Sequence, residues 1–153
     1  MAESIHKSWV FFADLLNVDQ ICEEIADCLR SAGQETHLFP VQMLAREALN
    51  NAVIHGSGNN PSLLVRCDLH IEDGLLNLSV EDDGPGFDWL TVLQRTIPSS
   101  EQVSGRGLRV YALYADLVNF NDQGNAVHLV RDLNRKAMDA SSPLDPAEGE
   151  RES

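Results

Sequence analysis

The stretch EALNNAVIHG, residues 47–56, closes a segment with helical periodicity and holds a glutamate, two asparagines and a histidine. Asparagine is a poor residue for a helix interior because its side chain competes for backbone hydrogen bonds. With about 100° of rotation per residue, Glu47, Asn51 and His55 lie along one flank of the helix, whereas Asn50 points toward solvent. The two asparagines are therefore not equivalent, and only Asn51 shares a flank with the glutamate.

The helix that contains this stretch is expected to span residues 38–56. Pro40 suits its first turn, and Gly56 suits its C-terminal cap. Apolar residues recur at helical spacing and form one stripe, which predicts that this face packs on a sheet. The stripe consists of Val41, Leu44, Ala45, Ala48, Leu49, Ala52 and Val53.

Glu47 and Asn51 place a carboxylate and an amide carbonyl one helical turn apart at the edge of this stripe. Hard oxygen ligands of this kind suit Mg²⁺, which keeps most of its own waters. The plain alternative is a surface pair that hydrogen-bonds along the helix. His55 also has a simple explanation, because a histidine in the last turn interacts favourably with the helix dipole. These residues alone do not decide between a cation site and a surface pair.

Two segments with alternating hydrophobicity, residues 61–71 and 75–84, predict an antiparallel hairpin with one solvated face. The alternation places Asp82 on the core face, where a carboxylate needs hydrogen-bond donors. Local backbone amides at the strand end are one source of donors, and a ligand N–H such as the exocyclic amine of adenine is another. Gly84 and Gly86 follow in a D-x-G-x-G pattern that lets the backbone approach a flat ring, although Gly-Pro-Gly is also a plain loop signal.

A further glycine pair, Gly105 and Gly107, stands at the start of a helix expected over residues 107–118. Free backbone amides and the positive end of the helix dipole make such a start an anion site. A single G-x-G pattern is weak, because many helices begin in this way. Its occurrence in one short domain with Asp82 and the Glu47–Asn51 pair strengthens the interpretation as a binding site.

The remaining segments complete a β-α-α-β-β-loop-α-β-β order. This order implies an α/β (α+β) two-layer sandwich, in which a mixed, mainly antiparallel sheet carries helices on one face. Residues 1–133 are expected to form this domain, and the polar residues 134–153 to form a disordered C-terminal tail. The other expected elements are a strand at 7–13, a helix at 17–34, a connection at 85–105 and a last hairpin around Gly124.

The amino-acid composition limits which binding partners and which cellular location are expected. A net charge of −13 disfavours binding to nucleic acid or to an anionic membrane, because Lys and Arg supply that affinity. The sequence has no apolar run of about 18 residues, so no transmembrane helix is expected. The first residues lack the basic start and apolar run of a secretory signal, so a cytoplasmic location is expected. Cys22, Cys28 and Cys67 match no zinc or redox spacing and are expected to be free thiols.

With three motifs in order, the chain resembles the GHKL ATPase superfamily, which includes histidine-kinase catalytic domains, the gyrase ATPase and Hsp90. EALNNAVIHG is similar to the N box, EDDGPGF to the first glycine box and GRGLRVYALYADLV to the second. Within the superfamily the chain looks like the stand-alone anti-sigma-factor serine kinases of bacterial partner-switching systems. The similarity rests on Glu47-x-x-x-Asn51-Ala52 and on Gly105-x-Gly107-Leu108.

The resemblance implies an ATP- and Mg²⁺-dependent protein serine kinase. Carried over by position, Glu47 would be the general base, Asn51 would ligate Mg²⁺, and Asp82 would accept a hydrogen bond from the adenine amine. Residues 87–104 would form a lid over ATP. The other nucleotide-binding positions would be Gly84, Gly86, Gly105, Gly107 and Leu108.

The same resemblance implies the partners: a sigma factor, an anti-anti-sigma antagonist of the STAS type, and a second copy of the chain in a homodimer. Two alternatives stay open, a partner-switch module that binds ATP without kinase activity and a regulator of a target other than a sigma factor. The last hairpin departs from the family's G-T-x-V pattern, since Asn125 and Ala126 follow Gly124. The arginines that could meet the phosphates, Arg95, Arg106 and Arg109, do not align with the family's lid arginine.

Overall fold

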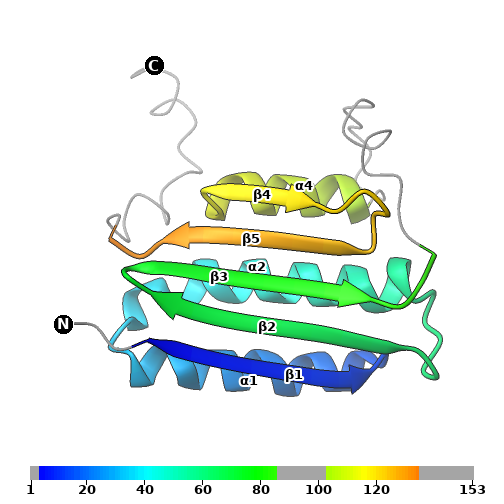
Figure 1. Ribbon diagram of the computed structural model, residues 1–153, viewed down its shortest axis with the longest axis horizontal. Helices are drawn as coiled ribbons and strands as arrows, with labels where there is room; N and C mark the ends of the chain where they lie inside the picture. Colours follow the sequence, from blue (N-terminus) through cyan, green and yellow to red (C-terminus); the bar gives the residue numbers. More distant parts are fainter. Residues whose placement is uncertain (1–3, 86–102, 135–153) are drawn as a thin grey trace.

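The computed structural model describes residues 4–85 and 103–134, with the backbone alone described over 103–108. Five strands form one sheet in the order β1-β2-β3-β5-β4, and each of the four strand pairings is antiparallel (Figure 1). The expected fold class is confirmed, and within it the sheet is antiparallel throughout rather than mixed. The strands are β1 Ile5–Phe12, β2 Leu64–Glu72, β3 Leu75–Asp82, β4 Leu117–Phe120 and β5 Ala126–Asp132.

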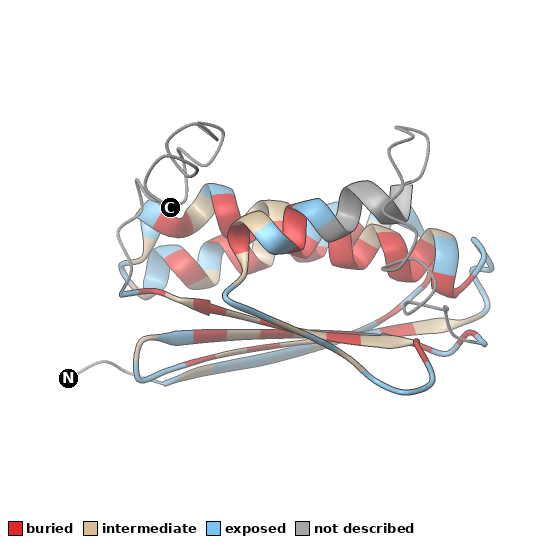
Figure 2. Cartoon of the chain, turned by 90° about the horizontal axis from the view of Figure 1, so that it is seen from above, coloured by how far each residue is buried: buried red, intermediate tan, exposed pale blue. Residues whose placement is uncertain are grey.

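The described helices all lie on one face of this sheet, so the chain forms two layers (Figure 2). They are α1 Leu15–Ser31, a 3₁₀ turn Glu35–His37, α2 Leu38–Asn51, a π-helical turn Ala52–Gly56 and α4 Val103–Tyr114. In the described part of the chain, no helix has both the length and the apolar character that a membrane crossing needs.

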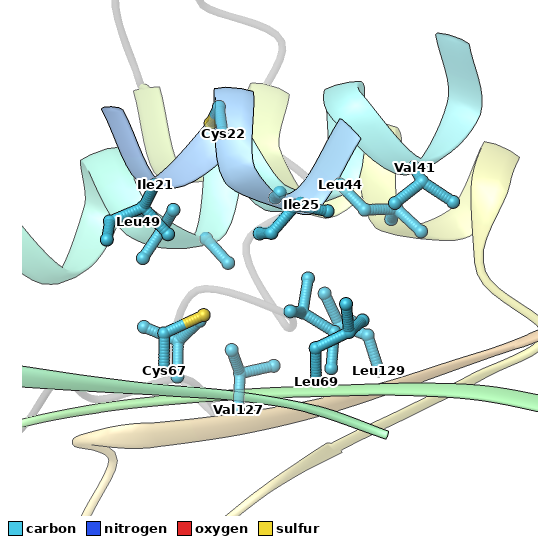
Figure 3. Close-up of a cluster of buried hydrophobic side chains, with 14 of the residues drawn as sticks. Ile21, Cys22, Ile25, Val41, Leu44, Leu49, Cys67, Leu69, Val127 and Leu129 are labelled. Atoms are coloured by element: carbon cyan, nitrogen blue, oxygen red, sulfur yellow. The ribbon is translucent and has the colours of Figure 1, made fainter. Parts of the chain in front are cut away.

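The core fills the space between the helix layer and the inner face of the sheet (Figure 3). The helices contribute their apolar stripes, including Ile25, Leu44 and Leu49, and the strands contribute residues such as Leu69 and Leu129, each of which is completely buried. Burying a side chain of this kind contributes about 1.5–3 kcal/mol. The periodicities of the sequence therefore identified the faces that pack together.

The first helix begins earlier than its apolar spacing indicates. The Asp14 side chain accepts a hydrogen bond from the backbone N–H of Leu16 at 2.9 Å and caps the helix. Leu15 and Leu16 then form its first turn while remaining exposed, so they do not extend the buried stripe. An exposed apolar turn carries no periodic signal, and for this reason the expected start at residue 17 was late.

The last helix is displaced from its expected position. Residues 107–118 were expected to be helical, but α4 runs from Val103 to Tyr114 and β4 begins at Leu117. Gly105 and Gly107 thus lie within the first two turns of α4. Glycine is disfavoured in helix interiors by about 1 kcal/mol relative to alanine, so a propensity argument places the start at the second glycine rather than before both.

A buried arginine joins the end of α4 to the sheet. Arg131, on the inner face of β5, is 0% exposed. Its Nη1 donates to the Tyr114 carbonyl oxygen at 2.7 Å, and its Nε donates to His37 Nδ1 at 3.1 Å. Because Nδ1 accepts, the histidine proton is on Nε2, which lies 3.0 Å from the Leu133 carbonyl oxygen. These contacts link the start of α2, the end of α4 and the end of β5.

Candidate functional site

A pocket opens at the end of the sheet where β3 finishes, between the helix layer and the turn that joins β4 to β5. Residues from α2 and its π-helical turn form one wall, and Tyr111 of α4 also lines the pocket. Figure 1 shows the start of α4 at this same end of the sheet. The polar groups and glycine backbone that line the pocket are Asn51, His55, Gly56, Asp82, Tyr111 and Asn125.

Asp82 lies on the core face as expected and is 5% exposed. Its Oδ1 accepts a hydrogen bond from the Gly84 amide at 2.8 Å, which is its side chain's only donor in the described part of the chain. Burial raises the pKa of the Asp82 carboxyl, while the Gly84 hydrogen bond lowers it. The carboxylate thus has a local amide partner and still lines the pocket with acceptor capacity to spare.

Two glycines pack directly against Asp82. A Cβ atom added to Gly56 would lie 2.0 Å from Asp82 Oδ2, and one added to Gly84 would lie 1.7 Å from the Gly56 carbonyl oxygen. Neither position therefore has room for a side chain. Gly84 was expected to let the backbone approach a flat ring, and in the structure its close approach is to the π-helical turn.

Gly56 was expected to be a helix cap, which is wrong. The helical segment continues through Gly56 in a π-helical turn, with Ser57 N–H donating to the Ala52 carbonyl oxygen at 2.7 Å. π-helical turns are rare and are found at functional sites. A glycine that ends a helix and one that makes room for a distant carboxylate look alike in a sequence, so nothing local distinguishes the two roles.

Glu47 and Asn51 both lie on the inner side of α2, with exposures of 8% and 6%. Their burial excludes a solvated surface pair, the alternative that the sequence left open. Asn51 Nδ2 donates to the Tyr111 hydroxyl at 3.4 Å, whereas Asn51 Oδ1 is buried and accepts no hydrogen bond from the described residues. A buried amide oxygen in this state is expected to meet a partner such as a water, an ion or a ligand. Asn50, by contrast, is half-buried.

His55 also lines the pocket, although it is an exposed residue. Partial burial lowers the pKa of its imidazole, which favours the neutral form near pH 7. His55 thus lies both in the last helical turn and at the pocket wall.

The described residues contain no group of three His, Cys, Asp or Glu side chains placed to hold a metal ion. A cation at Asn51 Oδ1 would take most of its ligands from water and from a bound anion. Mg²⁺ is commonly held in this way, with few protein ligands and several oxygens from water and phosphate. The residues present therefore fit Mg²⁺ bound together with a polyphosphate.

The other expected positions are only partly within the described structure. Gly105, Gly107 and Leu108 belong to the backbone of the first turns of α4, at the pocket end of the sheet. Gly86 lies outside the described residues, as do the expected lid up to residue 102 and the expected tail from residue 135.

Sequence reasoning missed Gly56 and did not assign Tyr111 or Asn125 to the site. Tyr111 is buried beside Asn51, and burial raises the pKa of its hydroxyl, so the hydroxyl stays protonated. Asn125 was noted only as a departure from a family pattern, yet it lines the pocket and contacts Asp82. Its place in a polar turn is ordinary, so only the fold shows that it reaches the end of β3.

Comparison with known proteins agrees with this architecture. The profile of the histidine kinase-like ATPase domain matches residues 11–131. The anti-sigma F factor of Geobacillus stearothermophilus is 32% identical over 92 residues, covering 58% of this chain and 62% of that protein. The anti-sigma F factor of Anoxybacillus flavithermus is 30% identical over 105 residues, covering 64% of this chain and 71% of that protein.

A solved structure shares the fold. The histidine kinase domain of the Erythrobacter litoralis EL346 blue-light activated histidine kinase superposes with a TM-score of 0.52 at 18% identity, covering 83% of this chain and 64% of that one. The resemblance to GHKL ATPases and to bacterial anti-sigma factors is thereby confirmed. The chain belongs to the histidine kinase-like ATPase domain family.

Proposed function

We propose that this protein binds ATP with Mg²⁺ and phosphorylates a serine of an antagonist protein, and that in its other state it sequesters a sigma factor. The observation that carries the proposal is the buried Asn51 Oδ1, which accepts no hydrogen bond from the described residues and lies on the same helix flank as Glu47. This flank adjoins a pocket that Asp82 also lines. The relatives' name, anti-sigma F factor, supports the regulatory half of the proposal.

Asp82 would recognise the base. Its carboxylate would accept a hydrogen bond from the exocyclic amine of adenine, while Gly84 continues to donate to Oδ1. Gly56 and Gly84 fix the carboxylate by packing against it and against each other. Gly86 follows Gly84 in the motif and would shape the same edge of the pocket.

The phosphates would lie toward the start of α4. Backbone amides of Gly105, Gly107 and Leu108 would donate to phosphate oxygens, as helix starts do for anions. Asn51 Oδ1 would hold Mg²⁺, which neutralises charge on the phosphates when bound. Asn51 Nδ2 would keep its hydrogen bond to Tyr111, which orients the amide oxygen toward the cation.

Glu47 would act as the general base. It would accept the proton of a partner's serine hydroxyl as that oxygen attacks the γ-phosphorus and the bond to the bridging β–γ oxygen breaks, releasing ADP. Glu47 is buried on α2, one turn before Asn51, which lines the pocket, and this position supports the assignment. The Glu47 carboxylate is the group that a kinase needs and a simple binding module does not.

The test is incubation of the purified protein with Mg²⁺, ATP and the protein products of neighbouring genes, with phosphoserine detected by mass spectrometry. We expect a phosphorylated partner with the native protein. Glu47→Gln should lower transfer at least about 100-fold while leaving ATP affinity within a few-fold. Absence of phosphoserine while ATP binds would instead identify an ATP-dependent partner switch.

The partner assignments need a separate experiment. Capture with the tagged protein in the presence of ADP or ATP should retain a sigma factor in one nucleotide state and a STAS-type antagonist in the other. The homodimer expected from the resemblance is tested by light scattering of the purified protein. Capture of a non-sigma regulator, with no sigma factor in either state, would replace the sigma factor by another target.

A further inference from the structure

The turn between β4 and β5 contacts Asp82, the residue that would recognise the base. We propose that Asn121 and Asn125 form a relay that positions Asp82, and that this relay sets selectivity for a purine with a 6-amino group. The inference rests on the proposed function, in which Asp82 accepts from the adenine amine. It assigns a role to the hairpin segment in which the chain departs from the G-T-x-V pattern.

Asn125 holds the main chain of Asp82 from two directions. The Asp82 N–H donates to the Asn125 carbonyl oxygen at 2.9 Å, and Asn125 Nδ2 donates to the Asp82 carbonyl oxygen at 2.8 Å. The regular β3–β5 register ends at the pair Glu81 and Ala126. The Asn125 side chain therefore extends the attachment of β3 by one residue, at the residue whose carboxylate lines the pocket.

The orientation of both amides follows from the contacts of Asn121. Its Oδ1 accepts from the backbone N–H groups of Gly124 at 2.8 Å, Asn125 at 3.0 Å and Ala126 at 3.1 Å, so this atom is the oxygen. Its Nδ2 must then be the donor to Asn125 Oδ1 at 2.6 Å. Asn125 consequently presents Nδ2 to Asp82, and no amide in the relay can be reversed without losing hydrogen bonds.

The relay complements the packing on the other side of Asp82. Gly56 and Gly84 confine the carboxylate, and Asn125 fixes the backbone that carries it. A hydrogen-bonding group recognises its ligand well only when it is held within about 0.5 Å of the productive geometry. Asn125 also lines the pocket itself, so any displacement of the turn moves the recognition edge.

Two substitutions distinguish a role of the relay in base selectivity from ordinary structural support of the turn. Asn121→Asp keeps an oxygen for the three backbone N–H groups but replaces the Nδ2 donor by an oxygen. The Asn125 amide would then turn its Nδ2 toward residue 121 and its oxygen toward the Asp82 carbonyl, which reverses the relay while the turn remains capped. Asn125→Ala removes the side-chain bond to Asp82. The control is Asn119→Asp, the same change at an exposed position of β4.

The experiment is calorimetric titration of Mg·ADP and Mg·IDP into each folded protein, because IDP carries a carbonyl oxygen where ADP carries the 6-amino group. We expect the native protein and Asn119→Asp to prefer ADP. In Asn121→Asp and Asn125→Ala the ADP-to-IDP affinity ratio should fall about ten-fold, the loss expected for one hydrogen bond to a charged group. Should Asn125→Ala fail to fold, Asn121→Asp carries the test.

If the turn only supports the structure, the two substitutions would lower the ADP and IDP affinities together and leave their ratio unchanged. An unchanged ratio in folded Asn121→Asp, with a native protein that prefers ADP, would overturn the relay. A native protein that binds ADP and IDP equally would overturn the base-recognition role of Asp82 and the relay with it. A native protein that binds neither would instead contradict the proposed function.

Discussion

The two ends of the sheet hold buried polar side chains in different ways. Where β5 finishes, Arg131 is completely buried and donates to the Tyr114 carbonyl and to His37, which are groups of the protein itself. Where β3 finishes, Asp82 and Asn51 are nearly as buried, but they line a pocket, and Asn51 Oδ1 accepts nothing from the described residues. Burial alone therefore does not mark a binding site, and the two ends differ in that Asp82 and Asn51 line a pocket.

The largest effect, on the free energy of unfolding, is expected at the end of the sheet that holds Arg131. Arg131→Ala leaves the Tyr114 carbonyl and His37 Nδ1 buried without this donor, and it should lower the free energy of unfolding by about 3 kcal/mol or more. Urea unfolding measures the change. The matched control is Arg66→Ala, since Arg66 lies exposed on β2 in a surface pair with Asp83, and its loss should be much smaller.

If the two ends of the sheet are independent, Arg131→Ala should lower stability without changing nucleotide affinity. Nucleotide affinity of the folded variant, measured at low temperature, should stay within a few-fold of the native value. A large loss of affinity in a folded Arg131→Ala protein would show that the two ends of the sheet are coupled and would remove the distinction drawn between them.

The next largest effect is expected at Gly56. A methyl group there would meet Asp82 Oδ2, so Gly56→Ala should displace the carboxylate and weaken nucleotide binding about ten-fold or more. Its cost in stability should be about 1–3 kcal/mol, as for other overpacked positions. Calorimetric titration and urea unfolding measure the two quantities.

Gly33→Ala is the control for this substitution. Gly33 has a φ of +71° and nothing within 4 Å of an added Cβ, so alanine there strains the backbone far from the pocket. It should lower stability and leave affinity unchanged. Equal affinity in native and Gly56→Ala proteins would contradict the proposed role of the contact between the π-helical turn and the Asp82 carboxylate.

The smallest effect is on the pH dependence of stability. Burial raises the pKa of Asp82 above the ordinary value of 3.8, so the folded protein binds the proton more tightly than the unfolded chain does. Stability of the nucleotide-free protein should therefore fall as pH rises from that value through the raised pKa. Asp82→Asn should show a shallower fall in unfolding curves recorded across this range. Equal slopes in the native and Asp82→Asn proteins would contradict the effect.

Much of the site was predictable because it depends on the faces of single elements. Strand alternation put Asp82 on the core face, and the helical period put Glu47 and Asn51 on one flank; both placements agree with the burial of these residues. The alternation in β5 likewise carries a signal for Arg131, since Val127, Leu129 and Arg131 share the inner face. The fold class followed from the order of such elements.

The rest depends on contacts between segments far apart in the chain. Gly56 meets Asp82 only after α2 packs beside β3, and Asn125 reaches Asp82 only after β5 pairs with β3. The π-helical turn inserts one residue without disturbing the apolar pattern of residues 38–56, so periodicity does not reveal it. The early start of α4 contradicts glycine propensity, which is only a weak local preference.

The central claim is that the acceptors at the β3 end exist for a nucleotide. The most direct measurement is calorimetric titration of Mg·ATP into native protein and into Asp82→Asn, with unfolding curves recorded on the same samples. The account predicts that the substitution weakens binding by roughly 1.5–3 kcal/mol, the contribution of a hydrogen bond to a charged group, without lowering the stability of the free protein. Unchanged ATP affinity would contradict the account and leave Asp82 as a cap on the Gly84 turn.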